Sequence, residues 1–355
     1  MFQKTTLFIG DEISQIEFEE NKTYLLYVAQ NCEIKKMVMN HLSTIYTVVF
    51  PAVIYGNKLY ENGVLVCELK KETTIAHCAC EKDSEKESHK EILTKSKSVL
   101  LFVHWLDPRI YQYLDRIFSF TSEDVSIIGA GCGRTSMDGH SVMTHNSVPL
   151  QEGFLVLFST QTLNIGLKHG ASFYNGYYIA HAQEGGKITT INGERAAPFY
   201  AKLVQKYFNE VVTPENIFSI GLKYPIGLGA TRGEQPLRVP VAIEGESLIV
   251  AGPMDAENTI SLMYIDNETI LKASSLAINE AKEGLHNLED KTCFIIECAG
   301  RKTVLGEDLF QELDNIISNF PPSTQCYGVL SLGEIANRSD KYIEYSNEAC
   351  AIGVF

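Results

Sequence analysis

The sequence predicts an α/β (α+β) fold in which mixed β-sheets are layered with helices. Short apolar runs of strand length alternate with amphipathic helical segments along nearly all of the 355 residues. Hairpin signals such as Glu244-Gly245-Glu246 interrupt this alternation, and they favour mixed sheets over purely parallel ones. A hydrophobic content of 45% with 21% charged residues is typical of globular domains, so the composition excludes a disordered chain.

The first half of the chain shows the same order of elements twice. Buried strands are predicted at 24–29, 48–55, 63–69, 98–103, 125–128 and 153–158. Helices are predicted after the first and the fourth of these strands, over 34–45 and 109–118. Residues 57–66 and 146–156 also resemble each other in their turn glycine and apolar run. Residues 20–160 therefore contain either two copies of a strand–helix–strand–strand unit or a chance likeness between apolar strands.

The second half of the chain alternates in the same way. Strands are predicted at 187–191, 237–243, 247–251, 293–298 and 327–332. A helix with Pro198 in its first turn presents Tyr200 on an apolar face, and further helices are predicted over 270–285 and 309–320. Prolines end the last helix, and 342–355 is predicted to be a closing strand pair.

The charge and the cysteine content restrict the partners and the compartment. A formal net charge of −14 argues against binding along a nucleic-acid backbone, which needs clustered Lys and Arg. Nine cysteines are an odd number, and most lie in apolar runs, so reduced thiols are favoured over a disulfide framework. No apolar run reaches about 18 residues, the length of a membrane span. We expect a cytoplasmic protein with no nucleic-acid or membrane partner.

Two short motifs have both a structural and a functional interpretation. Gly129-Ala-Gly131-Cys-Gly133 follows a predicted strand, but its spacing and the lack of a following helix favour turn glycines over a dinucleotide site. His77-Cys78-Ala-Cys80 offers metal ligands, but no second Cys or His pair has zinc-finger spacing, so strand thiols are favoured. The polar run 81–90 is interpreted as a solvated loop.

Four histidines lie in apolar or glycine-flanked surroundings, where a neutral imidazole could bind haem iron. They are His140, His145, His169 and His181. His169 precedes Gly170 in a predicted tight turn that could present the ring to an enclosed space. A single histidine in such surroundings is more often a surface residue or a hydrogen-bonded core residue than an iron ligand. The sequence has no nucleophile elbow, P-loop or local triad motif, so no catalytic residue is assigned.

Several short motifs, in the same order, resemble the FIST family of sensory domains. Cys298-Ala-Gly-Arg301, the helix around Glu312 and residues 328–335 are similar to the FIST C-terminal domain. The N-terminal and bridging motifs with such a resemblance are Ile165–Gly170, Ile191–Ala197, Tyr224–Leu228, Gly233-Glu234 and Arg238–Pro240. The resemblance implies a FIST N-terminal domain over 20–215 and a FIST C-terminal domain over 216–355.

Within this family the sequence resembles the NosP-type branch, which binds haem and senses nitric oxide. The similar stretches are 50–55, 57–65, 128–133 and 332–337. The resemblance implies a non-catalytic sensor with a haem cofactor, His169 as the first candidate iron ligand, and His145 and His140 as the next. FIST proteins act with separate signalling proteins, so a histidine kinase or a cyclic-di-GMP enzyme is the implied partner. A homodimer is left open.

Two alternatives to haem remain. The first is a FIST sensor of a small polar ligand such as an amino acid. Arg301 would bind its carboxylate and Glu334 its ammonium group, with Tyr224 and Arg238 also at the site. Arg301 and Glu334 could instead form an internal ion pair that fixes the fold. The second alternative is a hydrolase in which Cys298 is a thiolate nucleophile. The competing interpretation is that Cys298 is a buried structural thiol.

Overall fold

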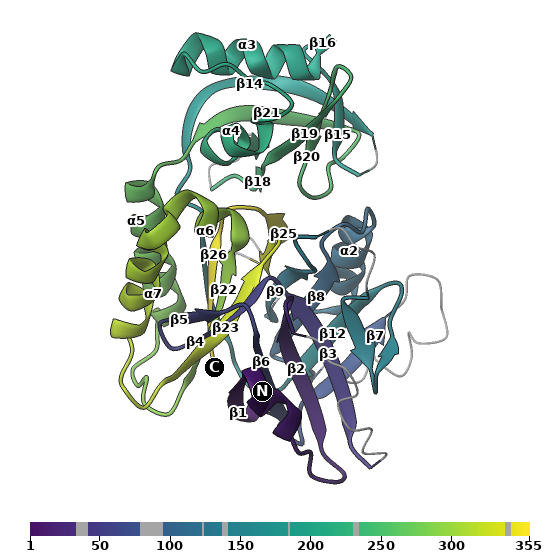
Figure 1. The fold of residues 1–355 in the computed structure, drawn as a ribbon, viewed down its shortest axis with the longest axis vertical. Helices are drawn as coiled ribbons and strands as arrows, with labels where there is room; N and C mark the ends of the chain where they lie inside the picture. Colours follow the sequence, from purple (N-terminus) through teal and green to yellow (C-terminus); the bar gives the residue numbers. More distant parts are fainter. Residues whose placement is uncertain are drawn as a thin grey trace.

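The chain folds into two lobes, one above the other in Figure 1. The computed structural model describes residues 1–32, 42–78, 95–122, 124–136, 141–183, 185–229, 234–337 and 342–355. Within these residues the lower lobe has three six-stranded sheets, and the upper lobe has one eight-stranded sheet. Helices pack against these sheets, so the predicted α/β class with mixed sheets is confirmed.

Each sheet of the lower lobe is built around one pair of parallel strands. The pairs are β2 (Thr23–Ala29) with β3 (Thr44–Phe50), β8 (Ser98–His104) with β9 (Ser126–Cys132), and β22 (Thr292–Cys298) with β23 (Gln325–Ser331). Parallel strands need a crossover connection, which is commonly helical. The second crossover contains α2 (Ile110–Phe120), and the third contains α6 (Ala299–Leu305) and α7 (Leu309–Ser318).

A short hairpin follows each parallel pair and joins a different sheet. The hairpins are β4 (Ala52–Tyr55) with β5 (Lys58–Tyr60), β10 (Met143–His145) with β11 (Val148–Pro149), and β24 (Glu334–Asn337) with β25 (Ile343–Ser346). β4 pairs with β23, β10 pairs with β3, and β24 pairs with β9. Each of three chain segments thus lends its hairpin to the sheet of another segment, in a closed cycle.

Two further antiparallel strands complete each of these sheets. The strand after each hairpin returns to its own pair: β6 (Gly63–Leu69) to β2, β12 (Phe154–Ser159) to β8, and β26 (Cys350–Val354) to β22. The outer strands that pair with them are β1 (Phe2–Ile9), β7 (Thr74–Cys78) and β13 (Asn164–Lys168). The same connectivity therefore occurs three times. The duplication of the first two segments stays a prediction. The domain limits 20–215 and 216–355 also stay a prediction.

The upper lobe is inserted between β13 and β22. Its strands, in sheet order, are β18 (Leu237–Arg238), β17 (Ile226–Leu228), β21 (Glu257–Tyr264), β14 (Ser172–Gln183), β15 (Lys187–Ile191), β20 (Ser247–Val250) and β19 (Pro240–Glu244), with β16 (Glu194–Arg195) paired to β15. β18 and β19 are the two edge strands of this order, and only Val239 separates them in the chain. The sheet therefore curls and brings its two edges together. α3 (Ala196–Phe208) and α4 (Ile217–Lys223) contribute to its core, and α5 (Asn267–Lys282) leads back to the lower lobe.

Four details of the predicted elements are wrong. The strand predicted over 237–243 is two strands, β18 and β19, at opposite edges of the upper sheet. The strand predicted over 48–55 is two strands in different sheets, because Pro51 lacks the N–H that would continue the ladder. Ile45 pairs with Tyr24 in the β2–β3 ladder and is not helical, while 34–41 of that predicted helix lie outside the described residues. The predicted closing pair at 342–355 is wrong because the exchange of hairpins places β25 and β26 in separate sheets.

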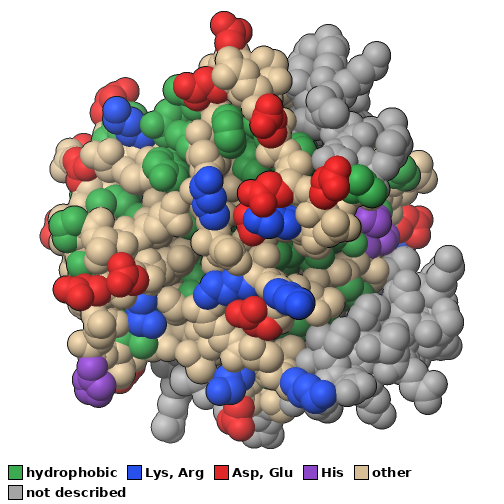
Figure 2. All heavy atoms as spheres, turned by 90° about the horizontal axis from the view of Figure 1, so that it is seen from below, with side chains coloured by type: hydrophobic (Ala, Val, Ile, Leu, Met, Phe, Trp, Pro, Cys, Tyr) green, Lys and Arg blue, Asp and Glu red, His purple; other side chains and the backbone are tan. Residues whose placement is uncertain are grey.

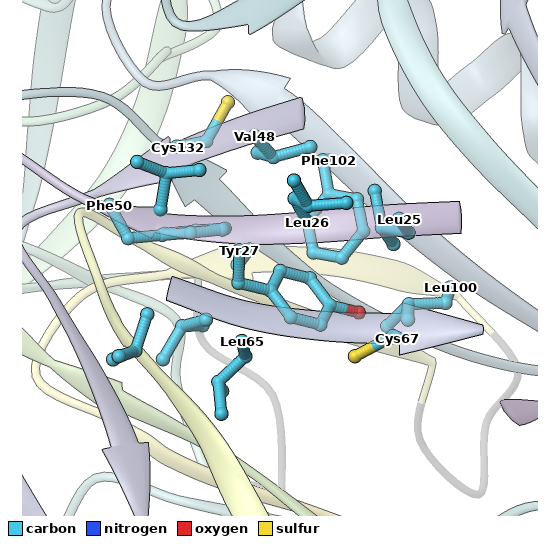
Figure 3. Packing of buried hydrophobic residues seen from close by; sticks show 14 of the residues in the cluster. Leu25, Leu26, Tyr27, Val48, Phe50, Leu65, Cys67, Leu100, Phe102 and Cys132 are labelled. Carbon is cyan, nitrogen blue, oxygen red and sulfur yellow. The ribbon is translucent and has the colours of Figure 1, made fainter. Parts of the chain in front are cut away.

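The largest hydrophobic core lies where the three lower sheets face one another. The first strand of each parallel pair contributes an aromatic ring to it: Tyr27 from β2, Phe102 from β8 and Phe294 from β22. The ring centroid of Tyr27 lies 5.6 Å from that of Phe102 and 5.4 Å from that of Phe294. Figure 3 shows Tyr27 and Phe102 among the leucine and cysteine side chains of this cluster. Large buried rings thus connect all three segments.

The underside of the lower lobe mixes both signs of charge. Lys and Arg side chains are interspersed with Asp and Glu over the described residues of this face (Figure 2). This distribution differs from the basic stripe that is typical of nucleic-acid-binding surfaces. None of the described helices combines the length and the apolar character needed to cross a bilayer.

Candidate functional site

Several buried ionisable side chains lie close together near α6, which is at the end of the lower lobe that faces the upper lobe (Figure 1). They come from the C-terminal end of β22, the first turn of α6, the helix α7, the start of β24 and the segment between β25 and β26. We call this group the buried charge cluster, and its members, all less than 2% exposed, are Glu297, Arg301, Glu312, Glu334 and Glu348. Four carboxyl groups thus accompany one guanidinium group. Burial of so many acids is unusual unless each is paired or protonated.

Arg301 lies at the centre of the buried charge cluster, and protein acceptors occupy all five of its N–H donors. These acceptors are Glu297 Oε1, Glu312 Oε1 and the carbonyl oxygens of Ile270, His169 and Glu348. The two ion pairs and three carbonyl bonds fix the guanidinium plane in one orientation. A ligand carboxylate could reach Arg301 only by displacing one of these acceptors. The ligand-binding role of Arg301 stays a prediction.

Glu334 does not pair with Arg301 in the described part of the chain. Its Oε1 accepts a hydrogen bond from Ser331 Oγ, and its Oε2 accepts one from the Ala349 N–H at 3.1 Å. Burial raises the pKa of Glu334 to about 7. The suggested Arg301–Glu334 ion pair is therefore wrong, since the carboxylate partners of Arg301 are Glu297 and Glu312.

Glu348 is the most unusual member of the buried charge cluster. Its side chain is 1% exposed, and neither carboxylate oxygen has a hydrogen-bond partner among the described residues. Its φ of +57° is a left-handed conformation that is uncommon outside glycine. Burial raises its pKa to about 8, with the Glu334 and Glu312 carboxyl groups opposing the effect of Arg301. A strained backbone and an unpaired buried acid are typical of functional sites.

Glycine at position 300 makes this placement of Glu348 possible. A Cβ atom on residue 300 would lie 1.7 Å from Glu348 Oε1, which is closer than two such atoms can approach. The glycine of the motif Cys298-Ala-Gly-Arg301 is therefore required for steric reasons, because the first turn of α6 has no room for a side chain beside Glu348.

The upper lobe is hydrogen-bonded to the chain just before Glu348. The Asn347 N–H donates to the Leu237 carbonyl oxygen of β18 at 3.2 Å. The next residue of β18, Arg238, is fully buried and donates from Nη1 to the Tyr345 carbonyl oxygen at 2.8 Å. The buried charge cluster is thus connected to both lobes. A ligand-binding role of Arg238 stays a prediction, because its observed contacts are within the protein.

His169 lies between β13 and β14 and is 1% exposed. Its Nδ1 accepts from the Ala171 N–H at 2.8 Å, which places the ring proton on Nε2, 2.9 Å from the Gln235 carbonyl oxygen. Both ring nitrogens are therefore engaged with backbone groups, and iron could bind only after one bond breaks. This arrangement does not fit an iron ligand. It is that of a histidine that holds its loop against the segment before β18.

The other two candidate haem ligands give no better fit. His145 is in β10 and stacks on Tyr46, with ring centroids 4.4 Å apart and 6° between the ring planes. His140 lies outside the described residues. Of the three candidate ligands, neither described one, His169 or His145, is placed to bind iron, and haem binding stays a prediction.

Tyr224 belongs to the core of the upper lobe. Its Oη donates to Glu210 Oε1 at 2.5 Å, and its ring stacks on Phe208 at a centroid distance of 4.0 Å. Of the four predicted ligand-binding residues, the structure brings Arg301 and Glu334 together in the buried charge cluster. It places Arg238 where the lobes meet and Tyr224 among upper-lobe aromatic rings.

Cys298 has the surroundings of a structural thiol. Burial raises its pKa well above the usual range, and the Glu334 and Glu348 carboxyl groups raise it further. Its Sγ accepts from the Glu348 N–H at 3.3 Å. Since every N–H donor of Arg301 is occupied elsewhere, the guanidinium does not stabilise a Cys298 thiolate. The arrangement thus does not support a cysteine nucleophile.

The two short motifs also have structural positions. Gly129 lies in β9, where a Cβ atom would be 2.3 Å from the Leu101 carbonyl oxygen, so the close approach of β8 requires glycine. This supports the structural interpretation of the glycine motif. Cys78 ends β7 and is buried, while Cys80 and the run 81–90 lie outside the described residues.

Glu297 and Glu348 are site residues that the sequence analysis does not assign. Glu297 interrupts the apolar strand Cys293-Phe-Ile-Ile and comes four residues before Arg301. A charged residue within a buried strand is rare unless it is paired, and this signal could have identified it. Glu348 gives no such signal, because tertiary contacts alone bury it.

Two family descriptions match the chain. The FIST N domain matches residues 40–194, and the FIST C domain matches residues 196–337. No curated protein matches the sequence. The FIST C match contains three of the four glutamates of the buried charge cluster as well as Arg301, and it ends before Glu348. The two matches cover most of the sequence in consecutive order, and the chain therefore belongs to the FIST family of sensory domains.

Proposed function

We propose that the protein is a non-catalytic sensor of a small ligand with a protonated amino group, such as an amino acid, bound beside Glu348. The observation that supports this proposal most is the pair of buried Glu348 oxygens, which lack a hydrogen-bond partner among the described residues. An ammonium group is a compact cation with three donors, and carboxylate oxygens are its natural acceptors. This is the ligand class of the first alternative to haem in the sequence analysis, a small polar ligand such as an amino acid.

The neighbouring residues define what each part of the site contributes. Glu334 lies near Glu348 and could accept a further hydrogen bond through a free lone pair of either oxygen. Arg301 holds Glu297 and Glu312 in place, and in this proposal its role is to position these carboxylates. The ligand cation would add positive charge to a cluster in which four acids accompany one base.

The link from Asn347 to β18 supplies a route from the site to the rest of the molecule. Asn347 precedes Glu348 and donates to the Leu237 carbonyl oxygen in the upper lobe. A ligand that changes the Glu348 backbone therefore acts on the contact between the lobes. It shifts the balance between two lobe arrangements only if it binds one of them more tightly. The receiver of this signal is a separate histidine kinase or cyclic-di-GMP enzyme.

Thermal-shift and calorimetric titrations test the proposal. Amino acids and primary amines are titrated into the full chain and into the Glu348→Gln variant, which keeps the side-chain size and cannot ionise. At least one amine should stabilise the wild-type protein and bind Glu348→Gln more weakly. The matched control, Glu289→Gln at an exposed position, should bind as the wild type does. If no amine binds, or if Glu348→Gln binds equally well, the proposal is wrong.

A further inference from the structure

We propose that Glu297, Glu312 and Cys350 form a binding site for a divalent transition-metal ion of the zinc type. The three residues come from β22, α7 and β26, and each is fully buried. One carboxylate oxygen of each glutamate and the Cys350 sulfur lie within 4.8 Å of one another. Ligands about 2.0–2.3 Å from a common ion lie slightly closer together than this, so small side-chain movements would complete the site.

The unused oxygens of the two glutamates are an independent sign of a missing cation. Among the described residues no N–H or O–H group donates to Oε2 of Glu297 or to Oε2 of Glu312, although both side chains are 0% exposed, and the group beside Glu297 is the Cys350 thiol itself. Buried polar atoms are nearly always paired, and those that are not need an explanation such as an unseen ion. A cation between these oxygens and the Cys350 sulfur supplies that explanation.

Arg301 gives the site the outer support that metal ligands usually have. It donates to Oε1 of Glu297 and to Oε1 of Glu312, so each glutamate keeps its second oxygen for the metal. Hydrogen bonds of this kind orient ligating carboxylates and are a regular feature of metal sites. Arg301 therefore acts as a positioning residue that aligns two carboxylates from different elements.

The ligand set favours one class of ion. A thiolate with two carboxylates suits Zn²⁺ and chemically similar ions better than Ca²⁺ or Mg²⁺, which prefer oxygen ligands throughout. Three protein ligands leave one tetrahedral position for water or a small ligand. On binding, Cys350 forms a metal–sulfur bond and its thiol proton passes to solvent. Cys350 follows Glu348 by two residues, so the ion would also fix the backbone beside Glu348.

Cobalt provides a probe with a direct readout of the thiolate. The full chain is treated with a chelator and titrated with Co²⁺, whose bond to a thiolate gives a near-ultraviolet charge-transfer band, and Zn²⁺ is then added as competitor. We expect one Co²⁺ per chain and loss of the band when Zn²⁺ binds. Glu312→Gln should weaken Co²⁺ binding about tenfold or more. Cys350→Ser should abolish the band, whereas Cys132→Ser, at another buried free thiol, should retain it.

The outcomes separate this inference from the proposed function. The inference is wrong if the wild-type protein shows no band, or if the band survives in Cys350→Ser. Should Cys350→Ser fail to fold by circular dichroism, Glu312→Gln decides, because an unchanged Co²⁺ affinity contradicts the site. The amine titrations are done on the chelated protein, so loss of amine binding with intact Co²⁺ binding contradicts the proposed function alone.

Discussion

The guanidinium of Arg238 lies over the ring of Tyr345, 5.3 Å from its centroid, and donates a hydrogen bond to the Tyr345 carbonyl oxygen at 2.8 Å. Arg238 belongs to β18 of the upper lobe and Tyr345 belongs to β25 of the lower lobe. Both side chains are buried, so this contact combines a cation–π interaction with a charge-assisted hydrogen bond away from solvent. Two residues further along the chain from Tyr345, Asn347 extends the contact towards Glu348.

We expect Arg238→Met to lower the free energy of unfolding by roughly 3 kcal/mol or more, because the buried carbonyl oxygens that Arg238 serves would lose their donor. Methionine keeps much of the side-chain length and removes the donors. Urea denaturation followed by circular dichroism measures the change. Lys202→Met, at an exposed helix position, is the control and should change stability little. A loss below about 1 kcal/mol for Arg238→Met would contradict the role of Arg238 at the lobe junction.

The Glu334 and Glu348 carboxyl groups should make the chelator-treated protein less stable as pH rises through the neutral range. The folded-state pKa values of Glu334 and Glu348, about 7 and about 8, lie above the usual glutamate value of 4.5 because both groups are buried. The folded protein therefore binds more protons than the unfolded chain between these values. The stabilisation is fully present below about pH 4.5 and is lost as pH rises through about 7 to 8.

Melting temperatures measured between about pH 5 and pH 8.5 test this dependence. The double variant Glu334→Gln/Glu348→Gln should show a flatter profile over this range, because glutamine does not titrate. Exposed Glu289→Gln should leave the slope unchanged. A double variant with the wild-type slope would show that these two acids do not contribute to the profile.

The individual strands of the lower lobe follow from the sequence better than their arrangement does. The apolar run Tyr24–Ala29 predicts a buried strand, and β2 occupies nearly the same residues. No local pattern predicts which sheet a hairpin joins, because the apolar side chains of β4 could pack in any of the three sheets. The pairing of β4 with β23 depends on contacts between residues more than 270 positions apart in the chain, such as Tyr55 with Tyr327. Such long-range choices are made by tertiary packing and not by periodicity.

The upper lobe gives a different reason for a missed element. β14 is a long strand, but register shifts between Phe173 and Asn175 and between Asn175 and Tyr178 break its alternation of buried and exposed residues. A bulged strand loses the period-two pattern on which strand prediction depends.

In the buried charge cluster, Arg301 was predictable from its motif, whereas Glu348 was not, because an acid in a polar loop gives no local sign of burial.

We expect Gly300→Ala to destabilise the protein and to do so mainly through Glu348. The added Cβ atom would occupy the position 1.7 Å from Glu348 Oε1, so Glu348 must move or the first turn of α6 must shift. Removing the opposing side chain with Glu348→Ala should restore part of the stability. In urea denaturation the double variant should show a coupling free energy of roughly 1–3 kcal/mol.

Glu289→Ala, far from the site in an exposed loop, is the control for this cycle and should show no coupling with Gly300→Ala. Additive effects of Gly300→Ala and Glu348→Ala would mean that Glu348 does not occupy the space beside residue 300. That result would also remove the steric explanation of the Cys298-Ala-Gly-Arg301 motif.

His169→Ala separates a structural histidine from an iron ligand. The variant loses the hydrogen bonds with the Gln235 carbonyl oxygen and the Ala171 N–H, both in a buried setting, and should lower the free energy of unfolding by about 1–3 kcal/mol. Haemin is added to both proteins, and the Soret region is recorded. Because both ring nitrogens of wild-type His169 are engaged with the backbone, the two spectra should be alike. A sharp Soret band in the wild type that disappears in a variant of unchanged melting temperature would instead identify His169 as an iron ligand, and the loop between β13 and β14 would then have to open for haem to bind.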